Sequence, residues 1–271
     1  MSEFLSWVSG LFELLFAPVQ RVEPVYGLAL VSVLTGVLLV LVFRFTSNQK
    51  EIKRVKDRIK AHLLEVRLFQ DQFGVVLKAH LHLLQCTLSY MKHSLKPLAV
   101  MLLPMVLLLA QLEMHLGRVP PRPNDTFLLV ARLGDPAGVE QVSLILPPGL
   151  TLDAPALRLR QEVNWRLRAE EYGDFEVGLA VAERTFTKQI RVTAEPLARL
   201  SARRVRASII QQLLYPGESP LPDDAPLEAI EVRYPARRID FGLYQGHWLV
   251  PFFVFSLLAG FAVKGLLRTE I

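Results

Sequence analysis

Apolar residues gather in three long runs, each close to the length needed to cross a lipid bilayer. The runs cover residues 26–45, 98–117 and 247–267, and each contains one formally charged residue, which lies toward one end: Arg44, Glu113 and Lys264. A membrane-spanning helix needs roughly 20 mostly apolar residues. The pattern therefore predicts three transmembrane helices.

Between the first two runs, apolar residues recur at every third or fourth position, which is typical of amphipathic helices. The second half of this segment repeats in steps of four and three, as coiled coils do. The positions are Ile52, Val55, Ile59, Leu63, Val66, Phe69 and Phe73 in the first arm, and Leu77, Leu81, Leu84, Leu88, Met91 and Leu95 in the second.

Residues 46–97 are therefore predicted to form a helical hairpin whose two arms pack antiparallel through these apolar faces. Ser47 or Asn48 is placed to cap the first arm, since Glu51 follows about one turn later. Gly74 is the expected point of reversal, and Pro97 marks the passage from the second arm into the second span. A parallel coiled-coil dimer is the alternative.

Residues 118–246 have a different pattern, with short alternating segments separated by glycine and proline turns. Strands are expected at 126–133, 139–146, 163–169, 175–182 and 185–193, with Trp165 near the centre. This spacing favours a small Ig-like β-sandwich. A short helix is expected within residues 207–216, and an irregular linker over residues 216–229.

The two ends of the chain complete the predicted organisation. Residues 1–25 place aromatic and aliphatic side chains at helical intervals, and we expect an amphipathic segment that lies in the membrane interface. A fourth short span, or an N-terminal extension of the first helix, is the alternative. Residues 268–271 form a short tail.

Net charge is distributed very unevenly along the chain. The total is +5, yet residues 44–97 hold eleven basic and four acidic residues, whereas residues 118–246 hold seventeen of each. Basic loops favour the cytoplasmic side. The expected fold is an α-helical membrane protein with three transmembrane helices and a cytoplasmic helical hairpin, plus an inserted extracytoplasmic all-β domain. Its N-terminus lies outside and its C-terminus in the cytoplasm.

Sequence motifs for catalysis or for metal binding are absent from the chain. There is no phosphate loop, dinucleotide fingerprint, zinc-spaced set or nucleophile elbow. His82 and Cys86 lie four residues apart, but one such pair cannot complete a metal site, and the same holds for His80 and His93. We therefore expect neither an enzyme nor a cofactor or metal site, and the single cysteine excludes an internal disulfide.

Polar residues within the apolar runs are the first candidates for function, because charge inside a membrane is costly. Arg44 either reaches the interface or projects into a polar cavity between helices. Ser32 and Thr35 share one helical face, but Thr35 lies nearly opposite Arg44, nine residues on at about 100° each. Gln111 lies in the outer third of the second run.

A second candidate is the basic surface of the first arm. It can fix the topology, attract anionic lipid, or contact RNA, including a ribosome, through phosphates. Its members are Lys50, Lys53, Arg54, Lys56, Arg58 and Lys60.

The order of these parts resembles the Oxa/YidC superfamily of membrane-protein insertases, especially the branch containing the insertase subunit of the endoplasmic-reticulum membrane complex and its prokaryotic relatives. Three stretches carry the resemblance: LLVLVFRFTSNQKEIKRVKDRIKAHLLEVRLFQD, LKPLAVMLLPMVLLLAQLE and YPARRIDFGLYQGHWLVPFFVFSLLAGFAVKG. The inserted β-domain departs from the compact core of that family.

The resemblance implies a groove that shelters a short polar segment of a client while its hydrophobic helix enters the bilayer. The groove cation would be Arg44, with Ser32, Thr35 and Gln111 as further polar groups. The implied partners are the lipid bilayer, nascent or short-tailed membrane proteins, and a ribosome, in a prokaryotic inner membrane. The alternative is a structural adaptor whose outer sandwich binds another envelope protein.

Overall fold

The computed structural model describes residues 10, 23–181, 183–242 and 244–266. The chain divides into two compact units. One contains Met1–Leu28 and Val106–Val250, and the other contains Ala29–Met105 and Pro251–Ile271. The amphipathic segment predicted at residues 1–25 lies almost entirely outside the described residues, as does the tail at residues 268–271.

The apolar runs lie in helices α2 (Pro24–Thr46), α4 (Phe73–Leu116) and α6 (Leu249–Leu266), and the basic helix α3 (Gln49–Leu68) lies between α2 and α4 in the chain. Within the described residues, α2 and α4 are long and apolar enough to cross a membrane, as judged by length and composition; α6 is a shorter apolar helix. These features suggest an association with a membrane.

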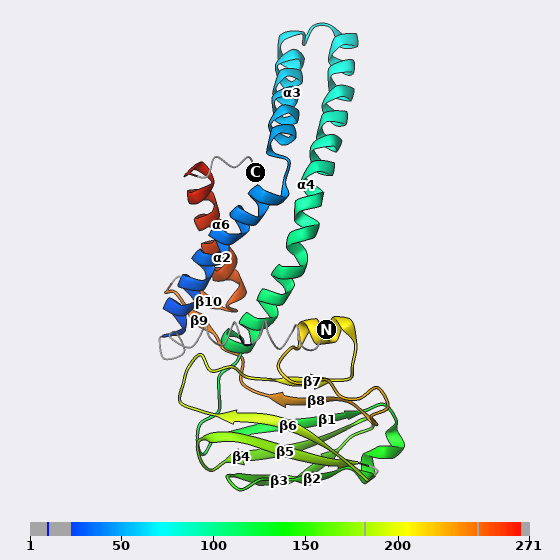
Figure 1. Ribbon diagram of the computed structural model, residues 1–271, viewed down its shortest axis with the longest axis vertical. Coiled ribbons are helices and arrows are strands. Elements are labelled where there is room, and N and C mark those ends of the chain that lie inside the picture. The colour runs from blue at the N-terminus through cyan, green and yellow to red at the C-terminus, as the bar shows by residue number, and fades with distance from the viewer. Residues whose placement is uncertain (1–9, 11–22, 182, 243, 267–271) are drawn as a thin grey trace. The chain divides into compact units, whose positions relative to one another are not determined.

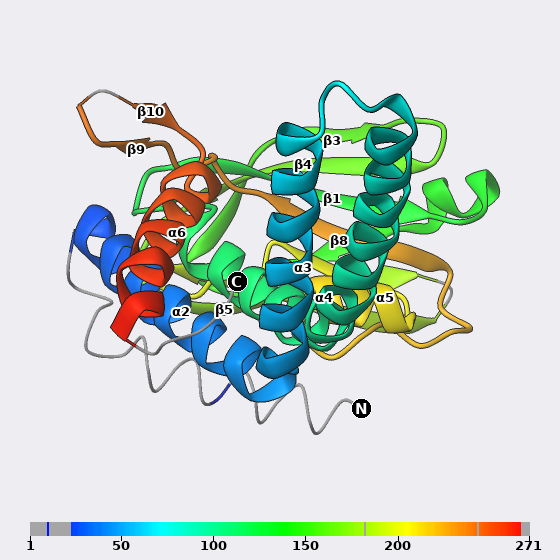
Figure 2. The same ribbon diagram turned by 90° about the horizontal axis from the view of Figure 1, so that it is seen from above.

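Helices α3 and α4 form the hairpin (Figures 1 and 2). Of the two caps that the sequence allows, Ser47 and Asn48, Asn48 is the N-cap of α3, and its side chain accepts a hydrogen bond from the Glu51 backbone N–H at 3.3 Å. The arms run antiparallel: Lys56 lies 5.9 Å from the Tyr90 ring centroid, and the His62 and His82 rings are 5.2 Å apart.

One expectation about the second arm differs from the structure. The reversal lies at residues 69–72, so Gly74 belongs to the first turn of α4 rather than to the turn itself. The second arm continues into the apolar run as one helix of 44 residues, α4, which contains both Pro97 and Pro104.

The face of α4 that packs on α3 is also different from the one predicted. Ala79 is fully buried there, and Leu83, Cys86 and Tyr90 along the same line are partly covered. The leucine repeat that begins at Leu77 lies on the exposed side instead.

The β-domain consists of antiparallel strands in two main sheets (Figure 1). The larger sheet has the order β3-β4-β1-β8-β7 and the smaller has the order β2-β5-β6. The strands of the larger sheet are β1 (Thr126–Leu133), β3 (Leu150–Arg158), β4 (Glu162–Ala169), β7 (Arg203–Val205) and β8 (Leu227–Arg233). Those of the smaller sheet are β2 (Ser143–Ile145), β5 (Gly173–Val181) and β6 (Arg184–Val192).

Alternating residues from both sheets share one apolar core. Trp165 on β4 is 3% exposed and lies opposite Leu129 on β1, while Leu179 and Phe186 contribute from β5 and β6. Period-two alternation places every second side chain on the inner face, so the strands predicted from this pattern at β1, β4, β5 and β6 are confirmed.

Other parts of the β-domain depart from the sequence prediction. Of the strand expected at residues 139–146, the first three residues belong to a 3₁₀ helix, η1 (Pro136–Gln141), which is capped by Asp135, and strand β2 covers residues 143–145. The expected linker and the residues after it include β8, a central strand of the larger sheet. The short helix is present as α5 (Ile209–Leu214), and a small hairpin of β9 (Ile239–Asp240) and β10 (Gln245–Gly246) precedes α6.

Candidate functional site

Helices α2 and α6 make a close backbone contact in the unit that contains Ala29–Met105 and Pro251–Ile271. A Cβ atom added at Gly36 would collide with the backbone carbonyl oxygen of Ser256. On α6, a Cβ added at Gly260 would lie 3.3 Å from Val40 Cγ2 and 3.6 Å from the Gly36 carbonyl oxygen. Small residues four apart on both helices permit this approach, as they do in membrane helix pairs.

The pairing of these contacts also gives the relative direction of α2 and α6. Gly36 meets Ser256, and one turn later Val40 meets Gly260, so the two helices run parallel through the contact. One turn further along each helix stands a cation, Arg44 on α2 and Lys264 on α6. The helix pair therefore carries both cations toward the same end.

Two of the residues predicted to line a client groove lie inside this packing. Ser32 is 0% exposed and Thr35 is 4% exposed. Their small side chains belong to the face of α2 that is buried, so they do not line an open surface. The signal that could have found their role is the Ser32-to-Gly36 spacing, repeated on α6 by Ser256 and Gly260.

Arg44 differs from its predicted neighbours because it is exposed. It stands in the last turn of α2, where a cation interacts favourably with the helix dipole. Among the described residues, no ion pair involves Arg44, whereas Lys264 lies 5.0 Å from the Phe261 ring centroid. Arg44 is thus the one predicted groove residue that the structure leaves accessible.

Gln111 belongs to the other compact unit, where it is 0% exposed near the end of α4. The helix end around it is held by polar contacts: His115 Nδ1 lies 2.9 Å from the Leu197 carbonyl oxygen, and the Leu200 N–H donates to the Met114 carbonyl at 2.9 Å.

Glu113 lies in the same helix end and links it to the residue just before α6. Trp248 donates its indole N–H to Glu113 at 2.8 Å, and Arg118 lies 3.6 Å from the same carboxylate. Arg237 donates to the Arg118 carbonyl at 2.8 Å, and burial lowers its pKa. Arg237 is thus a buried structural group.

The predicted basic surface is present on α3. Of its six members, all but Lys56 are exposed, and Lys50, Lys53, Arg54 and Arg58 line one surface hollow. Two exposed ion pairs accompany them, Arg54 with Glu51 at 3.9 Å and Lys60 with Asp57 at 3.7 Å. Such pairs contribute little to stability, so these cations remain available to an anionic partner.

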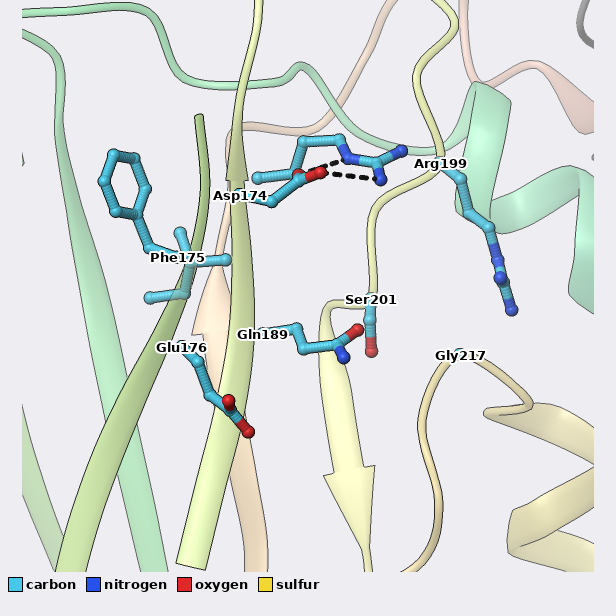
Figure 3. Close-up of a pocket in the computed structure, with 9 residues that line it drawn as sticks. Asp174, Phe175, Glu176, Gln189, Arg199, Ser201 and Gly217 are labelled. Atoms are coloured by element: carbon cyan, nitrogen blue, oxygen red, sulfur yellow. Dashed lines mark hydrogen bonds and ion pairs between the residues drawn. The ribbon is translucent and has the colours of Figure 1, made fainter. Parts of the chain in front are cut away.

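A polar pocket of about 350 Å³ opens on the outer side of β5 and β6 in the β-domain (Figure 3). Arg191 pairs with Asp174 through two hydrogen bonds of 2.6 and 3.1 Å along one wall. Ser201 and Gly217 lie opposite, and a Cβ at Gly217 would lie 2.7 Å from Ser201 Oγ. Glycine is therefore needed for this wall to approach Ser201.

An ion pair is buried beside this pocket. Lys188 is 0% exposed, and its ammonium contacts Glu218 and donates to the Ser201 carbonyl at 2.6 Å. Burial lowers the pKa of Lys188 below its usual 10.5, while the charge of Glu218 opposes that shift. Glu218 also accepts the Gln189 N–H at 3.1 Å, and Arg204 donates to the Thr187 carbonyl. These side chains satisfy backbone groups along the open edge of β6.

Several histidines and one cysteine lie on the hairpin of α3 and α4. No group of three or more metal-ligating side chains occurs in the described ranges. His80 Nδ1 lies 2.8 Å from the Val76 carbonyl oxygen, one turn earlier in the same helix, and Cys86 is partly covered by the hairpin packing. The structure thus gives these residues local roles.

Known proteins give no further guide to this arrangement. The chain matches no family model, no curated protein and no solved structure.

Proposed function

We propose that this chain is a membrane-protein insertion or assembly factor of the Oxa/YidC type, with α2, the apolar end of α4 and α6 in the bilayer. The observation that carries the proposal is the exposed Arg44 at the end of the tightly packed α2–α6 pair. An arginine at that place is costly in lipid unless it meets water or a polar partner. A client's polar segment is such a partner.

The placement of the other cations supports the same reading. Lys264 lies toward the same end of the helix pair as Arg44, and the basic surface of α3 follows α2 after only two residues. The positive-inside bias assigns this end to the cytoplasm. A client arriving from the cytoplasm, or a ribosome delivering it, would then meet the basic surface before it meets Arg44.

The β-domain is proposed to be an Ig-like sandwich on the extracytoplasmic side. Strands β1 to β6 pair in the order that strands B to G take in constant-type Ig domains, with β3-β4-β1 equivalent to D-E-B and β2-β5-β6 to C-F-G. Strand β8 lies beside β1, in the place of strand A. The arrangement therefore supports an Ig-like domain in which the last long strand replaces the first.

Insertion into proteoliposomes tests the function directly. The full chain is reconstituted, a single-span protein with a short translocated tail is supplied, and the protease-protected fraction of that client is measured. We expect Arg44→Ala to lower insertion severalfold and Arg44→Lys to retain most of it. Arg67→Ala, which removes an exposed cation from the end of α3, is the matched control. Equal insertion by Arg44→Ala and the wild type would reject the proposal.

The alternative function, an adaptor that binds an envelope protein, is favoured by the pocket in Figure 3. Glu176 and Gln189 on its rim are exposed, so their side chains are accessible to a partner. Replacing both with arginine should release an envelope partner recovered by crosslinking, while client insertion is unchanged. If Arg44→Ala leaves every phenotype intact and this double variant removes them, the adaptor function replaces the insertase.

A further inference from the structure

One face of α4 carries an apolar stripe that no other described residue of the chain covers. Its members follow each other in steps of four and three along the helix. Each is between 52% and 58% exposed: Leu77, Leu81, Leu84, Leu88, Met91 and Leu95. Leu98 and Leu102 continue the same spacing and are 61% and 64% exposed. The stripe therefore extends for almost four heptads, long enough for the repeat to indicate a coiled coil.

The intramolecular hairpin does not use this face. Helix α3 packs instead on Ala79, Leu83, Cys86 and Tyr90. If the stripe residues are the a and d positions of the heptad, these four residues occupy the c and f positions, on the opposite side of α4. The stripe thus stays open after the hairpin has formed. A contiguous apolar surface on a polar segment marks an interaction site.

We infer that the stripe is the interface of a parallel homodimer, in which α4 pairs with α4 of a second copy. All six positions from Leu77 to Leu95 hold leucine or methionine, so no polar a or d residue selects against self-pairing. Each helix would place its leucines into the spaces between those of the other. In each copy, α3 remains on the far side of its own α4.

The flanking residues favour parallel over antiparallel pairing. The e positions hold Lys78, Gln85 and Lys92, and the g positions hold Phe73, His80 and Thr87. In a parallel pair each e residue faces a g residue of the second copy, which sets Lys78 against Phe73 and Lys92 against Thr87. In an antiparallel pair e faces e, so that Lys78 opposes Lys92, a repulsive contact.

The orientation of the two copies leads to the same arrangement. This step rests on the proposed membrane placement, because two copies with the same topology in one bilayer hold their α4 helices parallel. Leu98 and Leu102 belong both to the stripe and to the apolar span. The bilayer therefore sets the two stripes at the same height, in register without a shift.

Disulfide formation in the full chain tests the interface. Cys86→Ala removes the only cysteine, and Leu84→Cys then places one thiol at a d position, where it faces its own equivalent in a parallel pair. The control is Ala61→Cys in the same background, because Ala61 is exposed on α3. In proteoliposomes at low protein density, oxidation should convert most of the Leu84→Cys chain to a covalent dimer and little of the control. Equal crosslinking of both variants would overturn the inference.

A second measurement uses charge instead of a thiol. Leu84 and Leu88 are each 58% exposed, so Leu84→Lys with Leu88→Lys leaves the hairpin core intact. The detergent-solubilised particle should fall from two chains to one, while Ala61→Lys stays dimeric. A monomeric wild type would contradict the inference. If the lysine variant then also lost client insertion, the stripe would be a binding surface for clients instead. A dimer that fails to insert clients would refute the proposed function alone.

Discussion

The helical unit (residues 29–105 and 251–271) and the β-domain (residues 118–246) differ in how each accommodates buried polar groups. Where α2 crosses α6, Gly36, Ser256 and Gly260 bring the backbones so close that there is no room for a larger side chain. At the edge of β6, the β-domain instead buries a charged pair, Lys188 and Glu218, and surrounds it with hydrogen bonds. One unit relies on shape and the other on compensation of charge.

This difference determines what each region tolerates. A buried ion pair is sensitive to loss of one partner but can often be replaced as a unit by apolar residues. A close backbone contact is sensitive to any added volume, whatever its polarity. The two regions should therefore respond to different substitutions, and the predictions that follow use this contrast.

The largest effect is expected at the buried pair. Glu218→Leu leaves the Lys188 ammonium buried without its counter-charge and the Gln189 N–H without its acceptor. Breaking such a pair costs about 3–5 kcal/mol. Hydrogen exchange of the β5 and β6 amides in the full chain should show a fall of that size in the free energy of opening.

The double variant is the matched control for this prediction. Lys188→Met with Glu218→Leu removes both charges and keeps similar volumes, so most of the lost stability should return. If the double variant opens as easily as Glu218→Leu alone, the hydrogen bond that Glu218 accepts from the Gln189 N–H, which both variants lose, accounts for the loss rather than the unpaired charge.

An intermediate effect is expected at the helix crossing. Gly36→Leu forces α2 and α6 apart, and overpacking of this kind costs about 1–3 kcal/mol. The melting temperature of the full chain in detergent, followed by helical circular dichroism, should fall. Gly265→Ala is the control, because a Cβ there meets nothing within 4 Å. An unchanged melting temperature for Gly36→Leu would show that the crossing tolerates a wider spacing.

The sequence predicted the parts of the structure that depend on local patterns better than those that depend on distant partners. Local patterns in the sequence located the helices of the hairpin, a cap at Ser47 or Asn48, and strands β1, β4, β5 and β6. The polar and proline-rich composition that precedes β8 concealed a central strand, which depends on pairing with β1, about 100 residues earlier in the chain. Local pattern carries no information about such a distant partner.

Contacts between segments were harder still to predict. The second arm has two apolar lines, and the more regular one, with Leu84 and Leu88, looked like the hairpin interface; the structure uses the line with Ala79. Lys188 lies in phase with Phe186 and Ile190, which signals an inward lysine, but nothing local identifies Glu218, 30 residues later, as its partner. Of the predicted groove, only Arg44 was both identified and accessible.

A smaller effect should appear in the pH dependence of the β-domain. Burial acts to raise the pKa of Asp153, but the hydrogen bonds and charges of Arg166 and Arg168 outweigh it and hold the pKa below its usual 3.8. The carboxylate therefore stabilises the fold above that value, and its contribution is lost as the pH falls through the lower, folded-state pKa.

The variant Asp153→Asn removes this contribution. At neutral pH it should be less stable than the wild type, and the gap between their free energies of unfolding should close as the pH drops below 3.8. Denaturation of both proteins at several pH values measures the gap. A gap that widens on acidification would mean that Asp153 has a raised pKa instead.

The smallest effect is expected for the exposed pair next to the buried one. Arg191 lies on β6, three residues after Lys188, and pairs with Asp174, but their side chains are 40% and 68% exposed. Exposed pairs contribute about 0–1 kcal/mol and are screened by salt. Arg191→Met should therefore change hydrogen exchange of the β6 amides only slightly, and raising the salt concentration should remove the difference. A loss as large as that of Glu218→Leu would contradict this prediction. It would show that the exposed pair stabilises the edge of β6 as much as the buried pair does.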